Sequence, residues 1–415
     1  MCIFISSAAG RWAGRRVETR RQKTGEQETM AEYIGIERKA RRAYGFDEIA
    51  LVPGAVTIDP DDVDTSWQLG PLKLPVPIIA SAMDGVVDVK FAIAMGKLGG
   101  LAVLNLEGIQ TRYENPAEVL DRIVGASPEE ATRLVQDIYS EPIKESLIGK
   151  RVAAIKASGV PAAVSAIPQR AERFAALAGE AGCDLFVVQA TVVTRKFVTS
   201  KGAPLDLAAL KKKIRMPLVC GNVVTYEACL ELFETGVDGV LVGIGPGAAC
   251  TTRGVIGVGV PQVTATCDAA AARDAYYKQT GRYVPVITDG GMRVGGDVCK
   301  AFACGSDAVM IGSVLARAAE APGRGFHWGM ATSNRNLPRG TRIHVGVSGP
   351  LEEILFGPAR IDDGSENLVG ALRNSMGVCG AKTIKEMHRA EIVIAPSIQH
   401  EGKLFQKAQK VGMGK

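Results

Sequence analysis

Short apolar runs alternate with stretches of helical periodicity through most of the chain. The runs are rich in β-branched residues and mostly end in Gly, Asn, Ser or Asp, which is typical of buried strands that open into loops. Eight such runs occur, at residues 76–83, 101–105, 162–166, 185–190, 217–222, 239–243, 284–290 and 308–313. The clearest helical patterns between them cover residues 169–180, 226–235, 263–278 and 297–303. This alternation predicts a parallel sheet built from strand–helix units.

The number of these units bears on the architecture. Eight consecutive units favour an α/β fold of the (β/α)8 TIM-barrel type, in which functional residues lie at the carboxyl ends of the strands. A doubly wound open sheet is the alternative, because sequence alone does not show whether the sheet closes. We therefore predict a single TIM-barrel catalytic domain over residues 30–415.

Three segments do not fit a minimal barrel. Residues 115–159 show helical patterns only, with Pro116 near one helix start and Ser127-Pro128-Glu129-Glu130 as a capped start of another, so we predict a helical insertion. Residues 322–342 are rich in Gly, Pro and Asn, and a loop of this length is usually an active-site flap or a disordered segment. Residues 388–415 form a C-terminal tail, of which 407–415 is predicted to be extended.

Charge separates the first residues from the rest. The chain has 49 Lys and Arg against 44 Asp and Glu, a net charge of +5. Residues 1–29 supply +3 of this and show no periodicity, so we predict a disordered extension there. The nearly neutral remainder argues against binding to nucleic acid or to an anionic membrane. No apolar run approaches the roughly 18 residues of a membrane span.

Cysteine and histidine usage argues against disulfides and a zinc site. The nine Cys are scattered without a CxxC pair, and the four His have no metal-ligand spacing. Unpaired thiols in a long chain are typical of a reducing compartment. We therefore predict a cytoplasmic protein in which most Cys pack as small apolar residues.

Cys250 is the exception among these thiols. It closes the glycine-rich stretch 243–249 after the sixth apolar run, and Thr251, Thr252 and Arg253 follow it. The thiolate is the reactive form of cysteine, and backbone N–H groups or a nearby cation favour it. At the catalytic rim of a barrel, this setting predicts a nucleophile.

The next two loops predict a phosphate site. The seventh and eighth runs end in Asp289-Gly290-Gly291 and Gly312-Ser313. In barrels the loops after the last two strands commonly hold a phosphate through backbone N–H groups, and glycine allows the close approach. Asp289 stands where a carboxylate could accept hydrogen bonds from both hydroxyls of a ribose. Beside the Cys250 loop, these two loops predict a bound phosphate ester.

Together these motifs resemble those of one family. The chain is similar to the IMP dehydrogenase/GMP reductase family over residues 44–387. The matching motifs are Ser81-Ala82-Met83-Asp84, Gly221-Asn222-Val223, Gly245-Pro246-Gly247, Cys250-Thr251-Thr252-Arg253, Gly257-Val258-Gly259-Val260-Pro261-Gln262, Asp289-Gly290-Gly291, Gly312-Ser313, Ser375-Met376-Gly377 and Cys379-Gly380-Ala381. The chain looks most like the short branch that lacks the CBS domain pair, whose place is taken here by the helical insertion.

The resemblance implies an oxidoreductase that acts on C2 of a purine nucleotide, GMP or IMP, with NADP or NAD. Cys250 would form a covalent thioimidate with C2, and Thr252 would act at the leaving or attacking group. The residues implied to bind the nucleotide are Ser81, Met83, Asn222, Gly247, Asp289, Gly291, Gly312, Ser313, Gly329, Met330 and Arg339. Those implied to bind the cofactor are Gln189, Thr191 and Gly243, and backbone carbonyls of Gly245, Gly247 and Cys250 would bind potassium. The family also implies a homotetramer.

Two departures from the family pattern bear on the reaction. Dehydrogenases of the family hydrolyse the thioimidate with an Arg-Tyr dyad on a mobile flap, but residues 331–336 contain no Tyr and are too few for that flap. We therefore favour GMP reduction over an IMP dehydrogenase with a different base. The family has Glu or Gln where this chain has Arg339, which cannot relay a proton. Either Glu352 or Glu353 would then relay the proton, or Thr252 would do so through water, or the enzyme is slow.

Other interpretations keep the barrel. Gln189 replaces the carboxylate that dehydrogenases place on the nicotinamide ribose, which slightly favours NADP and leaves NAD open. A non-catalytic purine-nucleotide sensor would explain Arg339 and the short flap. A barrel that binds FMN would share the glycine loops but leaves Cys250 unexplained.

Overall fold

The structure is a computed structural model that describes residues 31–200, 202–396 and 401–414, so the extension predicted at residues 1–29 lies outside the described residues. The chain divides into two units, Met1–Arg42 and Ala43–Lys415. In the first unit, β1 (Ala31–Tyr33) and β2 (Lys39–Arg41) form an antiparallel pair. The second unit holds the barrel and every feature described below.

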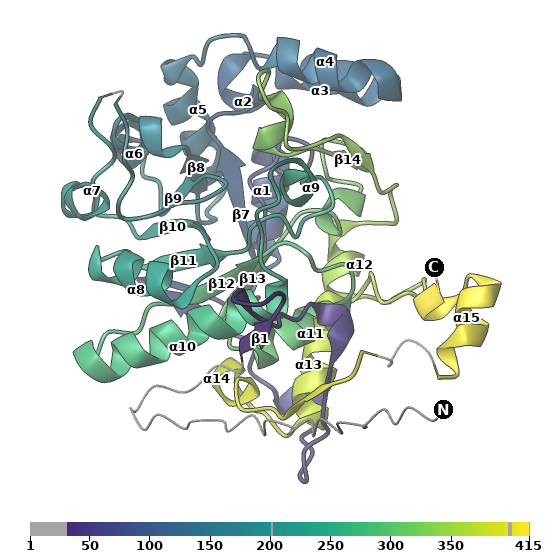
Figure 1. The fold of residues 1–415 in the computed structure, drawn as a ribbon. Helices are drawn as coiled ribbons and strands as arrows, with labels where there is room; N and C mark the ends of the chain where they lie inside the picture. The colour runs from purple at the N-terminus through teal and green to yellow at the C-terminus, as the bar shows by residue number, and fades with distance from the viewer. Residues whose placement is uncertain (1–30, 201, 397–400, 415) are drawn as a thin grey trace, which may run out of the picture. The chain divides into compact units, whose positions relative to one another are not determined.

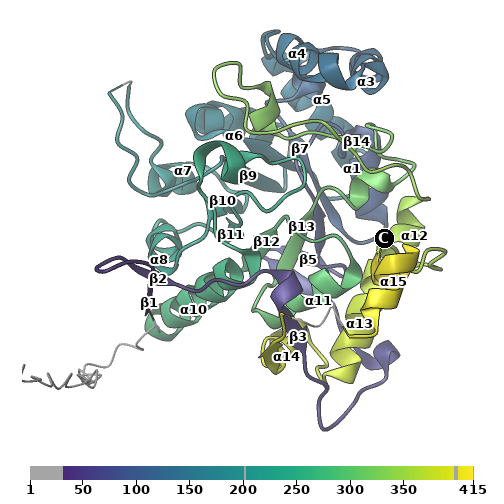
Figure 2. The same cartoon turned by 45° about the vertical axis from the view of Figure 1, so that its right-hand side comes forward.

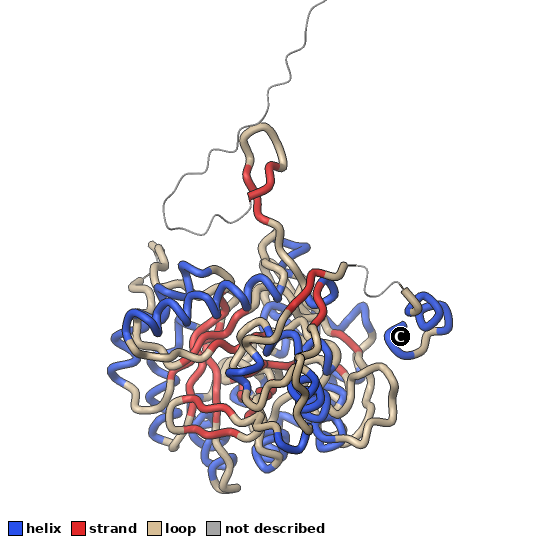
Figure 3. Tube along the Cα trace, turned by 90° about the horizontal axis from the view of Figure 1, so that it is seen from below, coloured by secondary structure: helices blue, strands red, loops and turns tan. Residues whose placement is uncertain are grey.

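Eight parallel strands of the second unit close into a barrel (Figures 1 and 3). They are β6 (Ile78–Ala80), β7 (Leu101–Asn105), β8 (Ala163–Ala166), β9 (Leu185–Gln189), β10 (Leu218–Val223), β11 (Gly239–Val242), β12 (Val286–Asp289) and β13 (Ala308–Ile311). Each strand pairs with the next along the chain, and β13 pairs with β6. Each of the eight predicted runs overlaps a barrel strand, so the predicted TIM barrel is confirmed and the open sheet was the wrong alternative.

Helices cover the outside of the barrel (Figure 2). After successive strands come α1 (Val89–Lys97), α5 (Glu145–Lys156), α6 (Ala171–Glu180), α7 (Leu207–Lys213), α8 (Tyr226–Glu234), α10 (Gln262–Thr280), α11 (Gly295–Ala303) and α13 (Leu368–Val378). Asp88, Asp206 and Thr225 cap α1, α7 and α8 by accepting a hydrogen bond from the backbone N–H three residues on. None of the described helices has both the length and the apolar character needed to cross a membrane.

Apolar side chains fill the barrel and close its amino end. Alternate strand residues such as Ile79, Val187 and Leu241 form the interior cluster. The antiparallel pair β4 (Trp67–Leu69) and β5 (Leu72–Leu74) adds Trp67 and Leu69 to this cluster. Because these side chains plug one end, open space for a ligand remains at the carboxyl ends of the strands.

Residues 115–159 are helical, as expected, but only part of them is extra to the barrel. The predicted helix starts are present: α3 (Pro116–Gly125) begins at Pro116, and Ser127 Oγ accepts from Glu130 N at 3.3 Å at the start of α4 (Pro128–Ile138). Helix α5 packs between α1 and α6 in the outer ring. The additional helices, α3 and α4, pack with α2 (Ile109–Arg112) around a small apolar core of their own.

The predicted flap and tail contain more regular structure than their composition indicates. Within residues 322–342, β14 (Phe326–His327) pairs with β15 (Ile343–His344), and a 3-10 turn covers Met330–Ser333. The tail prediction was wrong in part, because α15 (Lys403–Gln409) extends into residues 407–415; its Lys, Leu, Gln and Ala residues are good helix formers. Before it, β16 (Ile392–Ile394) pairs with β3 (Ile49–Leu51). Three short helices complete the second unit, α9 (Thr252–Ile256), α12 (Leu351–Phe356) and α14 (Ile384–Met387).

Candidate active site

A cavity of about 550 Å³ opens at the carboxyl ends of the barrel strands. Its size lies within the range of roughly 300–1,000 Å³ that is usual for ligand pockets. The residues that the family resemblance implied for catalysis and for binding nucleotide, cofactor or potassium all line it, namely Ser81, Met83, Gln189, Thr191, Asn222, Gly243, Gly245, Gly247, Cys250, Thr252, Asp289, Gly291, Gly312, Ser313, Gly329, Met330 and Arg339. The fold thus brings segments separated by more than two hundred residues to one cavity.

The Cys250 loop is held in place from both sides. Cys250 Sγ lies 3.1 Å from Thr252 Oγ1, and Cys250 N donates to Gly247 O at 3.0 Å. Behind the loop, Arg253 donates to Ile244 O at 3.2 Å and to a second carbonyl. Gly245 has a φ of +74°, and a Cβ there would come within 2.7 Å of the Arg253 side chain. The turn therefore presents the thiol to the cavity in one defined arrangement.

The buried thiols differ from Cys250 in their surroundings. Among the described cysteines, only Cys250 lines the cavity. Burial raises the pKa of Cys183, Cys229 and Cys299 to about 12, which keeps these thiols protonated and unreactive. Their packing agrees with the structural role expected for most of the cysteines.

Asp289 is oriented by two amide side chains. Its Oδ2 accepts from Asn222 Nδ2 at 2.7 Å and from Gln189 Nε2 at 3.2 Å. Burial raises the pKa of Asp289 to about 6, against the opposing effect of these two hydrogen bonds. Oδ1 makes no hydrogen bond to the described residues. The carboxylate therefore retains an acceptor for a ligand hydroxyl.

The barrel that carries this thiol, this carboxylate and these glycine loops is similar to known proteins. The profile of the IMP dehydrogenase / GMP reductase domain matches residues 43–403. The chain belongs to the IMP dehydrogenase/GMP reductase family.

Relatives and a solved structure agree with this family. An uncharacterized oxidoreductase of Mycolicibacterium smegmatis is 40% identical over 370 residues, which cover 87% of this chain and 99% of that protein. The inosine-5'-monophosphate dehydrogenase of Methanocaldococcus jannaschii is 29% identical, with 88% of this chain and 95% of that protein covered. The crystal structure of an IMP dehydrogenase/GMP reductase-like protein from Corynebacterium glutamicum is 34% identical, with a TM-score of 0.84 over 88% of this chain and 97% of that one. The chain is therefore an oxidoreductase of a family that uses NAD(P) and binds purine nucleoside monophosphates.

His327 is a cavity residue that the motifs did not indicate. It lies on β14 and is 1% exposed, and neither ring nitrogen has a hydrogen-bond partner among the described residues. Burial lowers its pKa to about 4, so the imidazole is neutral at physiological pH. A buried imidazole without partners next to a ligand cavity is suited to hydrogen-bond the ligand. Its position just before Gly329 and Met330 was the sequence feature that could have identified His327.

Asn105 and Glu107 also line the cavity without having been predicted. Asn105 Nδ2 lies 3.0 Å from Met330 Sδ, and its Oδ1 accepts from Glu107 N at 2.9 Å. Glu107 Oε2 forms an ion pair with Arg170 Nη1 at 2.6 Å. Both residues come at or just after the end of a predicted strand, which was the signal that could have identified them.

Arg339 connects the flap to the Cys250 loop. Its backbone carbonyl accepts from Thr251 N at 2.9 Å, while its Nε is buried without a partner among the described residues. Glu352 and Glu353, which the sequence offered as proton relays, do not line the cavity, and Glu353 Oε1 is 2.5 Å from Arg360 Nη2. Of the relays considered, Thr252 is the one that the cavity contains.

Proposed function

We propose that this chain is a GMP reductase that converts GMP and NADPH into IMP, ammonia and NADP. The observation that carries the proposal is the poor set of bases around Cys250. Glu107 is engaged by Arg170, Asp289 accepts from two amides, and the low pKa of His327 makes it a weak base. A dehydrogenase must activate water to hydrolyse the thioimidate, whereas a reductase has no such requirement.

Arg335 supports the same conclusion. It is the arginine within residues 331–336, where dehydrogenases of the family would have their dyad. Arg335 Nη2 binds Asp137 Oδ1 on α4 at 2.7 Å. Arg335 does not line the cavity. In this arrangement its side chain is held outside the cavity in which the nucleotide would bind.

The chemical steps follow from Cys250 and Thr252. The Cys250 thiolate adds to C2 of the purine, and the bond from C2 to the exocyclic nitrogen breaks once that nitrogen has been protonated, which releases ammonia. Thr252 Oγ1, which lies 3.1 Å from Sγ, would pass that proton from water. A bound reduced nicotinamide would supply a hydride to C2. Breaking of the S–C2 bond then returns the thiolate, so that GMP, NADPH and two protons give IMP, NADP and ammonium.

The remaining lining residues would hold the nucleotide. Asp289 Oδ1 would accept from the ribose, and backbone N–H groups of Gly291 and Gly312 with the Ser313 hydroxyl would bind the phosphate. A Cβ on Gly312 would come within 2.9 Å of Met83 Sδ, so glycine keeps this approach open. Ser81, Met83, Asn222 and Gly247 would line the nucleotide, with Gly329, Met330 and the donor-only side chain of Arg339 at the base edge.

Gln189, Thr191 and Gly243 line the cavity and would hold the nicotinamide end of the cofactor. Gln189 stands where dehydrogenases of the family have a carboxylate on the nicotinamide ribose, and this difference is the ground for favouring NADP over NAD. Potassium is a second candidate ligand, held by the carbonyls of Gly245, Gly247 and Cys250. The Gly247 carbonyl accepts one hydrogen bond, from Cys250 N, and keeps a lone pair for a cation. The family resemblance also supports a homo-oligomer.

IMP dehydrogenase is the second candidate function, and the names of relatives favour it. The relatives of Methanocaldococcus jannaschii and Cryptosporidium parvum, 29% and 31% identical, are inosine-5'-monophosphate dehydrogenases. In that case Thr252 or His327 would have to activate water.

Two parallel assays distinguish these functions. Purified protein is incubated with GMP and NADPH, and separately with IMP and NAD, while the absorbance of the reduced nicotinamide is followed. Consumption of NADPH in the first mixture, without NADH formation in the second, supports the reductase. Formation of NADH in the second mixture, without NADPH consumption in the first, shows that the protein is a dehydrogenase instead. Each mixture is repeated with and without potassium chloride. Nucleotide binding without turnover in either mixture contradicts both functions.

A further inference from the structure

The flap is packed into the small core of the inserted helices. Trp328, 1% exposed, belongs to the same apolar cluster as residues of α3 and α4, including Leu120 and Val135, and Phe326 packs against it. Figures 1 and 2 both show the green flap segment beside α4. The inserted helices are therefore in direct contact with the segment that carries Gly329 and Met330.

A chain of hydrogen bonds fixes Trp328 to the barrel through the insertion. Trp328 Nε1 donates to Tyr139 Oη at 2.9 Å, and Tyr139 in turn donates to Asp84 Oδ2. Asp84 Oδ2 also accepts from Ile109 N at 3.1 Å. Tyr139 directly follows α4, and Asp84 directly follows Met83, which lines the cavity. One buried hydroxyl thus joins the insertion, the flap and a barrel loop.

Contacts at the surface also join the flap to α3 and α4. Arg324 pairs with Asp121 of α3, and Arg335 pairs with Asp137 of α4. Arg342 donates to the carbonyls of Ile123 and Ala126 at the end of α3, at 2.8 Å for Ala126. Exposed ion pairs of this kind contribute little one by one, so the buried chain through Tyr139 has the larger effect on the flap.

The two ends of the cavity-lining segment are held by different parts of the molecule. At one end Trp328 lies in the insertion core, and at the other Thr341 N donates to Ala249 O at 2.9 Å beside Cys250. Between them, residues 334–337 are exposed. Gly329 and Met330 come directly after the Trp328 anchor, so displacement of Trp328 moves them away from the ligand.

We propose that α3 and α4 act as a fixed clasp that keeps the flap closed over the nucleotide, and that Tyr139 is the positioning residue of this clasp. The proposal rests on the proposed function only in taking a purine nucleotide as the ligand. Loss of the clasp lowers the fraction of molecules with a closed flap, and the apparent affinity for the ligand falls by that fraction. Loss of the clasp should therefore raise the KM for the nucleotide and leave kcat at saturation nearly unchanged.

The test uses the full chain with Tyr139→Phe, which removes the shared hydroxyl and keeps the ring. The matched control is Tyr113→Phe, because the Tyr113 hydroxyl donates to Ile138 O within the insertion and does not reach the flap. For Tyr139→Phe we expect the rate of tryptic cleavage after Arg335 and the KM for GMP each to rise roughly tenfold, as for loss of a buried hydrogen bond to a charged group. The control is expected to match the wild type in both.

A clasp of this kind is excluded if Tyr139→Phe is cleaved at the wild-type rate, or if its kcat falls while KM is unchanged. If the wild type turns over neither substrate, the proteolysis comparison alone decides on the clasp, and only the proposed function fails. Should Tyr139→Phe not fold, Trp328→Phe removes the same hydrogen bond from the other side and is subject to the same two criteria.

Discussion

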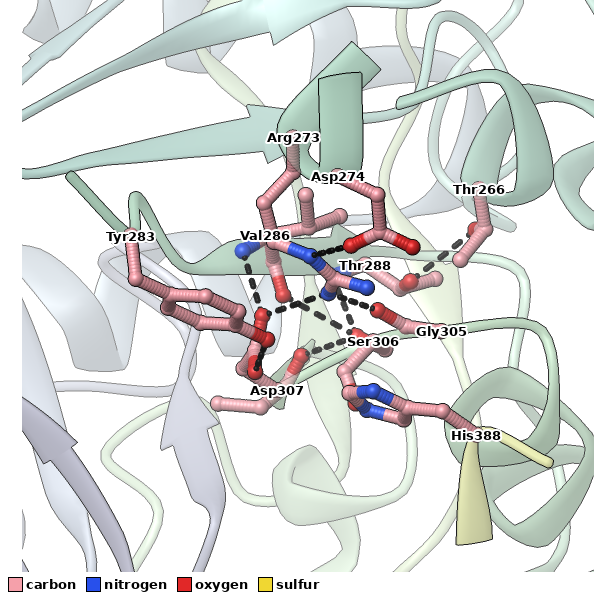
Figure 4. Close-up of polar contacts among 11 residues, drawn as sticks. Thr266, Arg273, Asp274, Tyr283, Val286, Thr288, Gly305, Ser306, Asp307 and His388 are labelled. Atoms are coloured by element: carbon pink, nitrogen blue, oxygen red, sulfur yellow. Dashed lines mark hydrogen bonds and ion pairs between the residues drawn. The ribbon is translucent and has the colours of Figure 1, made fainter. Parts of the chain in front are cut away.

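Arg273 at the amino end of the barrel and His327 at its carboxyl end differ in whether their polar atoms have partners. At the amino end, Arg273 donates to Gly305 O at 2.6 Å and to Asp307 Oδ2 at 3.0 Å (Figure 4). Asp307 also accepts from Tyr283 Oη at 2.6 Å and from Val286 N. At the carboxyl end, by contrast, His327 and Arg339 Nε are buried without partners among the described residues.

This difference separates stability from function. A buried ion pair that is fully hydrogen-bonded is costly to break, because removing one partner leaves the other charged and buried. Polar groups that lack partners cost the free protein stability, and a ligand that supplies the partners recovers it. Substitutions at the amino end should therefore affect unfolding, and substitutions at the cavity should affect binding and turnover.

The largest expected effect is on turnover. Cys250→Ala removes the nucleophile, so we expect kcat to fall by at least roughly 10³-fold, with the Kd for GMP and the melting temperature nearly unchanged. The control is Cys379→Ala, a half-buried thiol away from the cavity, which should keep wild-type turnover. Steady-state kinetics and calorimetric binding measure both. Turnover that survives in Cys250→Ala contradicts covalent catalysis.

The second effect is on stability. Arg273→Ala leaves Asp307 buried without its cation and should lower the free energy of unfolding by about 3–5 kcal/mol, with kcat per folded molecule unchanged. Arg173→Ala breaks the exposed pair with Glu145 and should lower the stability far less, because solvent screens an exposed pair. Denaturant titration gives both values. Equal losses in the two variants would show that burial of the Arg273 network adds nothing.

The third effect is a pH dependence at Asp289. Since burial raises its pKa to about 6, the carboxylate is protonated below that pH and cannot accept from the ribose. Affinity for GMP should therefore fall as the pH is lowered from about 8 to about 5. The stability of the free protein has the opposite sign: it decreases as the pH rises from the unfolded pKa towards about 6.

Calorimetry on the wild type and on Asp289→Asn isolates this carboxylate. The phosphate of GMP titrates in the same range but does so equally with both proteins. The pH dependence of affinity should be steeper in the wild type. If affinity depended on pH in the same way for both proteins, Asp289 would not bind the nucleotide.

The smallest effect is expected for two histidines, one at each end of the barrel. His327→Phe replaces an unpartnered ring and should raise the free energy of unfolding by about 1 kcal/mol while weakening GMP binding several-fold. His388 Nε2 lies 2.9 Å from Ser306 O, so His388→Phe should lower the stability by about 1 kcal/mol and leave binding unchanged. Thermal unfolding measures the stability of each variant, and calorimetry measures its binding of GMP. The same sign of stability change in the two variants would contradict the comparison.

The residue pattern predicted the barrel and the loops of Cys250, Asp289 and Ser313, and the family resemblance supplied most of the other cavity residues. Strand–helix alternation is a local pattern. Polar residues at the carboxyl ends of parallel strands lie at one rim of the barrel, however the helices pack outside it. The outer ring was less predictable: α5 has the same periodicity as α3 and α4, and only its contacts with α1 and α6 show that it belongs to the barrel. The Trp328–Tyr139–Asp84 chain joins residues far apart in sequence, and no local pattern encodes such a pairing.

Mass spectrometry of the protein, quenched during turnover of GMP with NADPH and then digested with trypsin, tests covalent catalysis at Cys250 most directly. We expect a purine nucleotide bonded to the peptide that contains Cys250, and no such adduct in Cys250→Ala. Steady consumption of NADPH without any adduct at Cys250 would contradict it.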